Sequence, residues 1–442
     1  MTAAELSLAG DFPPVTREQW LALAGPLEKL ANTTYDGIVR APLYTADDVT
    51  AAPGPVGNAP GWDVRQRHDV PDAAAILDDL EHGVTSLWLV DLPADALPEL
   101  LREVYLDLAP VTLDAGAEFA TAAQTLLRIH EDKGIAPDAV RGNLGADPLG
   151  LRASTGADTD PAAAARLASR VAAEFPALRA FVVDALPYHE AGGSDAQELG
   201  CALATGVAYL RAGTAAGLSP AAAAGQLEFR YAATVDQFLT IAKLRAARRL
   251  WARVGEVCGI TGAAQLQHAV TSPAALTRRD PWVNMLRSTL ACFAAGVGGA
   301  DAITVLPFDS AVGLPDAFGR RIARNTQSIL LEESHVATVL DPAAESWYVE
   351  RLTDELAETA WEWFTEIERS GGMSAALDSG MIADRLARTW RARSANIADG
   401  TDKITGVTVF AKEDEQPLVR PPAPAARTGG LPRVRYAEEF ES

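Results

Sequence analysis

The sequence lacks the features that would tie it to a membrane or to secretion. No run among its 442 residues approaches the roughly 20 uninterrupted apolar residues of a membrane-spanning helix. Its first residues, MTAAELSLAGDFPP, do not show the basic and then apolar order of a signal peptide. We therefore expect a cytoplasmic protein, and 48% hydrophobic residues are enough for one large core.

Cysteine, histidine and positive charge are also scarce. Cys201, Cys258 and Cys292 are far apart and form no CxxC motif, so we expect them to be buried core residues. With 38 basic against 59 acidic residues, the net charge of −21 disfavours nucleic acid as a partner. Five of the six histidines have no histidine or cysteine at metal-ligand spacing: His68, His82, His130, His268 and His335. We expect no metal site on this chain.

What the chain does contain is a regular alternation of short β-forming runs and longer helical stretches. The eight runs are residues 84–91, 110–114, 140–146, 179–185, 227–232, 266–271, 302–307 and 337–341. Helical periodicity marks residues 117–132, 162–174, 195–211, 234–257, 281–295, 315–333 and 346–370. Strict alternation requires a parallel sheet covered by helices, and eight such units close into a (β/α)8 TIM barrel.

The two ends of the chain differ from this pattern. Residues 16–30 form an amphipathic helix and residues 51–61 are rich in Pro and Gly, so residues 1–60 are expected to be a helix and an extended arm that contacts another subunit. Residues 61–410 are the expected barrel. Residues 411–442, which include PLVRPPAPAARTGGLPR, have the composition of a linker, and we expect a further domain beyond them.

Two motifs that could suggest a binding function favour structural interpretations instead. IAKLRAARRLWARV (residues 241–254) could be a nucleic-acid patch, but an outer barrel helix whose arginines pair with acids is the better interpretation. GVGGAD (residues 296–301) has the composition of a phosphate loop. Its glycines end a helix and precede a strand, however, which is the reverse of a dinucleotide site, so a turn is expected.

Candidate catalytic residues lie at the ends of the expected strands. Tyr188 and His189 follow the fourth expected strand, on the face where barrel enzymes place their active sites, and could polarise a substrate carbonyl. Hydrogen bonding within the loop is the alternative role for both. An unrelated barrel hydrolase or lyase could instead use carboxylates at the strand ends, namely Asp91, Asp114, Asp184 and Asp309.

Several long segments resemble the methylmalonyl-CoA mutase family. They are FLTIAKLRAARRLWARV (238–254), DPWVNMLRSTLACFAAGVGGADAITVLPFD (280–309), GLPDAFGRRIARNTQSILLEESH (313–335) and DPAAESWYVERLTDELAETAWEWFTEIERSGG (341–372), with PLYTADDV (42–49) and DKITGVTVF (402–410). The resemblance implies an adenosylcobalamin-dependent radical isomerase that interconverts methylmalonyl-CoA and succinyl-CoA. It also implies a barrel that threads the CoA tail along its axis and a C-terminal domain that holds the corrinoid.

The family's catalytic segments are mostly replaced. Leu186 and Pro187 stand where the family has Tyr-His, GNLGAD stands for TIQND, and DLPADAL stands for RGYDSD. No DxHxxG cobalt-ligand signature occurs. The resemblance thus implies a non-catalytic small subunit, with no catalytic, cofactor-binding or metal residues of its own, that pairs with a catalytic large subunit holding the cobalamin. A two-residue deletion would align Tyr188 and His189 instead, giving a catalytic barrel that uses a separate cobalamin-binding protein.

Overall fold

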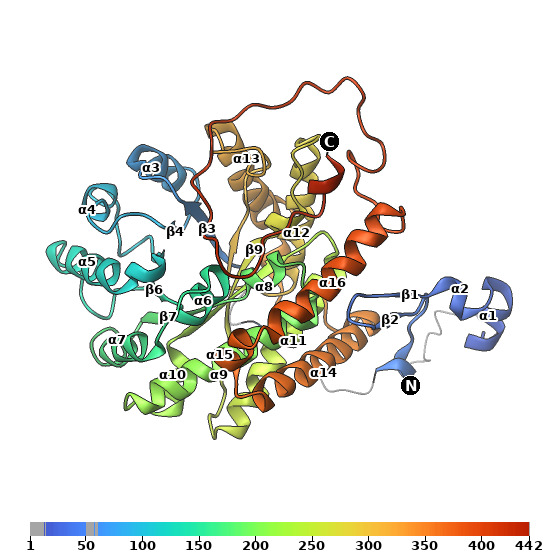
Figure 1. Ribbon diagram of the computed structural model, residues 1–442, viewed down its shortest axis with the longest axis horizontal. Helices are drawn as coiled ribbons and strands as arrows, with labels where there is room; N and C mark the ends of the chain where they lie inside the picture. Colours follow the sequence, from blue (N-terminus) through green and yellow to red (C-terminus); the bar gives the residue numbers. More distant parts are fainter. Residues whose placement is uncertain (1–12, 14, 50–56, 58–60, 442) are drawn as a thin grey trace, which may run out of the picture.

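A closed barrel of eight parallel strands forms the centre of the molecule in the computed structural model, which describes residues 13, 15–49, 57 and 61–441 (Figure 1). The strands follow one another around the ring in sequence order, and the last pairs with the first. They are β3 (Asp63–His68), β4 (Ser86–Val90), β5 (Val111–Asp114), β6 (Gly142–Ala146), β7 (Leu178–Asp184), β8 (Leu227–Ala233), β9 (Leu266–Thr271) and β10 (Ala302–Thr304). The predicted (β/α)8 TIM barrel is confirmed.

Helices surround this barrel and return the chain from the end of one strand to the start of the next. All seven predicted helical stretches contain a helix, whereas the helix Met381–Ala398 and several short helices were not predicted. The helices between the strands are α3 (Ala73–Glu81), α4 (Leu97–Leu100), α5 (Phe119–Asp132), α6 (Pro148–Thr155), α7 (Pro161–Glu174), α8 (Leu186–Glu190), α9 (Asp195–Ala215), α10 (Pro220–Gly225), α11 (Gln237–Val257) and α12 (Val283–Val297). After β10 come α13 (Ala317–Ser328), α14 (Trp347–Arg369), α15 (Met373–Asp378) and α16 (Met381–Ala398).

The strand assignment needs correction at both ends of the barrel. The first strand is β3, with the sequence DVRQRH, which was not predicted because its charged side chains hide the apolar pattern. Arg65 of β3 points into the barrel, where Glu228 neutralises it. The predicted eighth strand, residues 337–341, is not a strand, and residues Val336–Thr338 form a 3₁₀ turn. The strand before Tyr188 and His189 is therefore the fifth of the barrel.

Strand β6 is irregular because two of its five residues are glycines with positive φ. Gly145 has a φ of +71°, and a Cβ at this position would lie 1.9 Å from the carbonyl oxygen of Leu113 on the neighbouring strand. The strand contains a register shift between Asn143 and Ala146. The Asn143 side chain accepts a hydrogen bond from the Gly145 amide at 2.8 Å and so stabilises the irregular backbone. Only glycine fits at position 145.

The basic helix of the sequence, α11, is packed between the barrel and α14. Arg245 is buried and pairs with Asp341 at 2.9 Å and with Glu350 of α14 at 2.6 Å. The predicted pairing of its arginines with acids is confirmed. The turn 296–301 joins α12 to β10 as expected. Cys201 and Cys292 are buried as predicted, but Cys258 is exposed, because it follows the last turn of α11.

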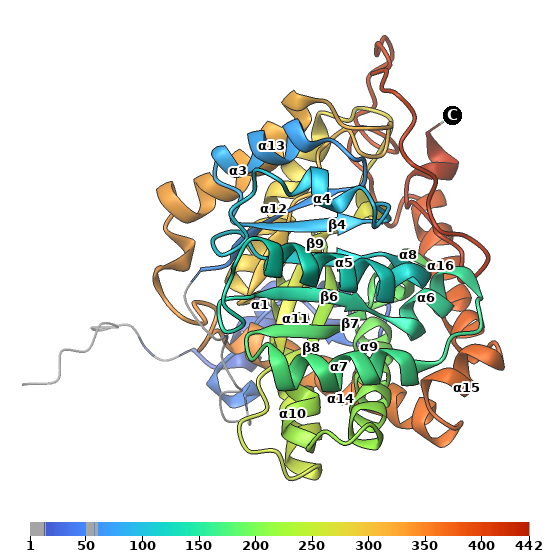
Figure 2. The same cartoon turned by 90° about the vertical axis from the view of Figure 1, so that its left-hand side faces the viewer.

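The N-terminal helix is broken in two, α1 (Arg17–Ala24) and α2 (Leu27–Leu30), because Gly25 and Pro26 interrupt it. A short hairpin follows, β1 (Asn32–Thr33) with β2 (Val39–Arg40). Most of the predicted Pro/Gly-rich run 51–61 lies outside the described residues. At the other end, the C-terminal segment, defined as residues 411–441, has almost no regular structure. It runs across the barrel end toward which the strand arrows point (Figure 2).

Candidate functional site at the barrel mouth

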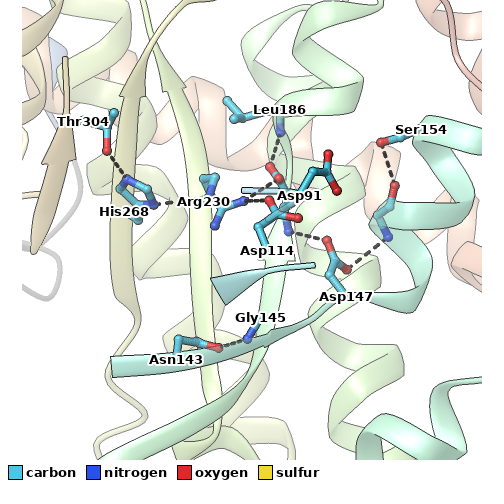
Figure 3. A network of polar contacts seen from close by, with 12 residues as sticks. Asp91, Asp114, Asn143, Gly145, Asp147, Ser154, Leu186, Arg230, His268 and Thr304 are labelled. Carbon is cyan, nitrogen blue, oxygen red and sulfur yellow. Dashed lines mark hydrogen bonds and ion pairs between the residues drawn. The ribbon is translucent and has the colours of Figure 1, made fainter. Parts of the chain in front are cut away.

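The centre of the barrel is closed by side chains that meet across its axis. Trp88 lies on β4 and Arg230 on β8, which are diametrically opposite in the ring of eight. Even so, the Arg230 guanidinium stacks 4.1 Å from the centre of the Trp88 ring. It also donates to Asp184 at 2.7 Å and to Asp114 at 3.1 Å (Figure 3). Two large side chains therefore fill the axis at this level.

A second cross-barrel contact lies one layer deeper. Arg65 of β3 and Glu228 of β8 form an ion pair at 2.5 Å, although two strands lie between β3 and β8 in one direction around the ring and four in the other. Both side chains are nearly inaccessible, at 5% and 3% exposure. His268 of β9 is buried beside them, and its pKa is lowered well below the ordinary value by burial and by the charges of Arg65 and Arg230. His268 is therefore neutral.

An apolar cluster lies beside these charged groups at the same end of the barrel. Its buried side chains form a cluster of their own, separate from the core beneath the outer helices: Trp88, Val90, Leu186, Ala232, Val270, Leu276 and Leu306.

The C-terminal segment covers the same end of the barrel. Its backbone hydrogen-bonds to loops that follow different strands: the Leu431 amide donates to Ala153, that of Val434 to Glu190 and that of Tyr436 to Ala274. Its arginines reach carboxylates in these loops: Arg420 contacts Asp309 and Asp316, Arg427 contacts Asp91 and Asp114, and Arg433 contacts Glu190. A segment with the composition of a linker is thus held to the barrel by ion pairs of three of its arginines, and its Glu415 adds a contact to Arg279.

Arg427 lines the same small cavity as Arg230. Its guanidinium lies 2.5 Å from Asp91 and 2.7 Å from Asp114. Burial would raise the pKa of Asp114, but the charges of Arg427 and Arg230 outweigh burial and hold that pKa below its ordinary value. The cavity that Arg427 and Arg230 leave between them measures about 20 Å³, which is room for about one water molecule.

The four carboxylates of the sequence analysis do not share one site. Asp91 and Asp114 meet at Arg427, and Asp184 joins Asp114 through Arg230. Asp309 lies apart from them and pairs with Arg420 at 2.5 Å. Each of the four therefore has an arginine partner.

Asp147 follows β6 and belongs to the same region, although it was not singled out from the sequence. The Tyr209 hydroxyl and the amides of Gly150 and Asp184 donate to its carboxylate. Burial, and then the charge of Asp184, raises the pKa of Asp147 to about 7. Its capping role for α6 accounts for the bonds that it accepts.

Tyr188 and His189 are both buried and face different surroundings. Tyr188 belongs to the core beneath the outer helices, and burial raises the pKa of its hydroxyl well above the ordinary value. His189 is 3% exposed, and its Nε2 lies 2.6 Å from the Ser272 hydroxyl. Burial, and then the charge of Lys243, lowers the pKa of His189 to about 3, so the imidazole is neutral. The Tyr436 ring of the C-terminal segment lies against it.

A buried charge cluster behind His189 was also missed from the sequence. Lys243 of α11 is inaccessible and contacts Glu198 at 2.7 Å and Asp195 at 2.9 Å, both on α9. Burial raises the pKa of Glu198 to about 7 despite the nearby ammonium group. Lys243 and Glu198 are 45 residues apart in the sequence, so no local motif predicts their contact. The cluster joins two helices and adjoins His189, whose Nδ1 lies 3.8 Å from the Glu198 carboxylate.

Comparisons with known proteins agree with the fold and with the segments described above. A family model described as methylmalonyl-CoA mutase matches residues 91–428, which include the first part of the C-terminal segment. The chain belongs to the methylmalonyl-CoA mutase family. A mutase is an isomerase, so the family is one of isomerases.

Relatives within the family include proteins named methylmalonyl-CoA mutase small subunit. That of Streptomyces virginiae is 58% identical over 99% of this chain and 77% of its own length. That of Propionibacterium freudenreichii subsp. shermanii is 40% identical over 100% of this chain and 76% of its own. By contrast, a methylmalonyl-CoA mutase of Rhizobium meliloti is 38% identical over only 56% of this chain and 35% of its own length. The chain spans about three quarters of the small-subunit relatives.

Two general features of the described residues complete the description of the site. No cluster of three or more histidine, cysteine or acidic residues with the geometry of a metal site occurs among them. None of their helices combines the length and the apolar character that crossing a membrane requires.

Proposed function

We propose that this chain is the non-catalytic small subunit of a heterodimeric methylmalonyl-CoA mutase. In this proposal a large subunit of the same family interconverts methylmalonyl-CoA and succinyl-CoA in the cytoplasm, and the present chain supports it. The proposal is favoured by the relatives named small subunit, which cover almost the whole chain.

The observation that carries the proposal is the closed barrel axis. The family resemblance implies a CoA tail threaded along this axis, yet Trp88 and Arg230 from opposite strands meet there at 4.1 Å. Arg65 and Glu228 close the next layer. A tail that entered would have to separate a buried ion pair, which costs about 3–5 kcal/mol when one partner is left alone.

The adenosylcobalamin implied by the family does not fit the mouth of this chain. The face that would receive a corrin carries the C-terminal segment, which Arg420, Arg427 and Arg433 hold to the loops. His189, the histidine nearest this face, is buried and bonded to Ser272. We therefore assign the cofactor to the large subunit and none to this chain.

The test is to purify the chain alone and together with a large subunit of the family. Conversion of methylmalonyl-CoA to succinyl-CoA is then measured with adenosylcobalamin. We expect no turnover from the chain alone, turnover from the complex, and an unchanged rate in the complex when this chain carries Asp91→Asn. Turnover by this chain without the large subunit would overturn the proposal. If that turnover required a separate cobalamin-binding protein, the alternative with Tyr188 and His189 in the active site would be supported instead.

A further inference from the structure

A cavity of about 310 Å³ lies on the outside of the barrel, where the turn of the N-terminal hairpin meets the start of α9, the middle of α14 and α16 (Figure 1). We call it the α16 cavity. The lining side chains that bear on a ligand are Asp36, Gln197, Trp363, Arg385, Arg388 and Thr389. None of the residues that line it belongs to a barrel strand or to the C-terminal segment. The α16 cavity is therefore separate from the mouth, and its volume is at the lower end of the roughly 300–1,000 Å³ range of small-molecule sites.

Two arginines give the α16 cavity positive charge. Arg385 and Arg388 are three residues apart on α16, so they face the same side of the helix. The Arg385 guanidinium lies over the Trp363 ring, 4.9 Å from its centre. Neither guanidinium forms an ion pair or a hydrogen bond with a described residue. Both can therefore offer their N–H donors to a ligand.

Acidic residues lie near these arginines but do not neutralise them. Asp384 precedes Arg385 and stands one helical turn before Arg388, and its exposed carboxylate forms no ion pair with either. Glu362 and Glu366 of α14 are exposed and likewise form no ion pair with a described residue. In a chain of net charge −21, such acids weaken the attraction for an anion at long range. Binding of an anion therefore depends on direct contact with the two guanidinium groups.

The side chains behind the arginines are held in place. The Trp363 indole donates to Cys201 Sγ at 3.4 Å, and a Cβ at Gly200 would lie 2.6 Å from that ring, so the ring is tightly packed. Gln197 is 6% exposed, and its Nε2 donates to the Thr389 hydroxyl at 2.8 Å. The second hydrogen of that Nε2 has no acceptor among the described residues. The cavity thus presents donors that are already positioned, which lowers the entropy cost of binding.

A carboxylate lines the α16 cavity apart from the arginines. Asp36 accepts a hydrogen bond from the Ala196 amide at 3.3 Å and forms no ion pair with a described residue. Burial, and then the charge of Asp195, raises the pKa of Asp36 to about 6, so the carboxylate is ionised at pH 7.5. Positive charge is already present there, because Arg393 is close to Asp36 and Lys243 pairs with Asp195 at 2.9 Å. A neutral hydroxyl group therefore suits Asp36 better than a further cation.

We infer that the α16 cavity binds a small phosphate monoester that carries hydroxyl groups. Two guanidinium groups match a phosphate monoester, which has a charge of about −1.5 to −2 at pH 7 and accepts forked hydrogen bonds. Arg385 and Arg388 hold the phosphate, while Asp36 accepts from one hydroxyl group and Gln197 donates to another. The volume suits a sugar phosphate rather than a whole CoA ester. Because the cavity is separate from the mouth, its ligand goes beyond the proposed function and does not depend on it.

The experiment is titration calorimetry of the purified full chain at pH 7.5 with ribose 5-phosphate as the probe. Ribose and inorganic phosphate test the two halves of the probe, and malate tests a dicarboxylate of similar charge. The test variants are Arg385→Met and Asp36→Asn. The matched control is Arg391→Met, because Arg391 is exposed on the same helix and donates its Nε to the Ala387 carbonyl of that helix. The melting temperature without ligand confirms that each variant folds, and Arg388→Met replaces Arg385→Met if the latter does not.

We expect ribose 5-phosphate to bind, and Arg385→Met to weaken binding about 10-fold or more, the loss expected when a hydrogen bond to a charged group is removed. Asp36→Asn should weaken the binding of ribose 5-phosphate but not that of inorganic phosphate, while Arg391→Met should change neither. Asp384→Asn should strengthen binding, because it removes a negative charge next to Arg385 in the helix.

Three results would overturn the site as described. The first is no binding of ribose 5-phosphate by the unmodified chain, and the second is equal binding by the unmodified chain and the arginine variant. The third is inorganic phosphate or malate bound as tightly as ribose 5-phosphate, which would reduce the cavity to a general anion site and refute the phosphate ester.

Discussion

Replacing Glu228 by leucine removes one half of the ion pair that crosses the barrel interior. Arg65 then keeps a charge that is 5% exposed, with Ser86 as its other hydrogen-bond partner. Two unit charges about 4 Å apart attract each other by about 4 kcal/mol at an effective dielectric constant near 20. Removal of one partner from buried pairs costs about 3–5 kcal/mol. We therefore expect Glu228→Leu to lower the free energy of unfolding by about 4 kcal/mol.

The double variant Arg65→Met with Glu228→Leu tests whether the loss of stability comes from leaving one buried charge unpaired. It removes both charges and fills the space with apolar atoms, so its stability should return to within about 1–2 kcal/mol of the unmodified chain. The assay is urea unfolding followed by circular dichroism. Arg211→Met is the control, because its pair with Glu368 has an exposed arginine, at 63%, and should cost less than about 1 kcal/mol. If Glu228→Leu costs no more than that control, the interior ion pair does not exist as described.

Two further predictions concern the helix junction and the irregular strand. Lys243→Met leaves Glu198, whose pKa is already raised to about 7, without its counter-charge. A raised carboxyl pKa favours the folded state below that pKa and loses this contribution as the pH rises, so the loss, about 3–5 kcal/mol near pH 8.5, should shrink near pH 5.5. Equal losses in urea unfolding at both pH values would contradict the assignment. Gly145→Ala forces a Cβ against the Leu113 carbonyl and should cost at least about 2 kcal/mol more than Gly217→Ala, which also has positive φ but open space around it. Similar melting temperatures for the two alanine variants would contradict this prediction and would show that strand β6 shifts to accommodate the added Cβ.

The fold could be predicted from sequence wherever the barrel strands are apolar. Strands such as β7, with the sequence LRAFVVD, pack one side against helices and keep an apolar pattern that a local window detects. Strand β3 could not be found in this way, since its Arg65 points inward and is neutralised by Glu228, 163 residues later. The false eighth strand, residues 337–341, has suitable composition, but no neighbouring strand is left to pair with it after β10 closes the ring.

The candidate site was predictable only in part, for a related reason. The sequence by itself determined that strand ends would carry Asp91, Asp114 and Asp184, because parallel strands bring their carboxyl ends to one face. It also indicated the family, because several long segments resemble those of methylmalonyl-CoA mutases. Only the tertiary structure decided that Arg230 crosses to Trp88 and that Arg427 covers the mouth. These contacts join residues more than 100 positions apart, and composition alone assigns the C-terminal segment to a free linker. The arginines of the C-terminal segment find partners only because the closed ring brings the carboxylates of separate strands to one face. Whether the mouth is covered therefore depends on the assembled barrel.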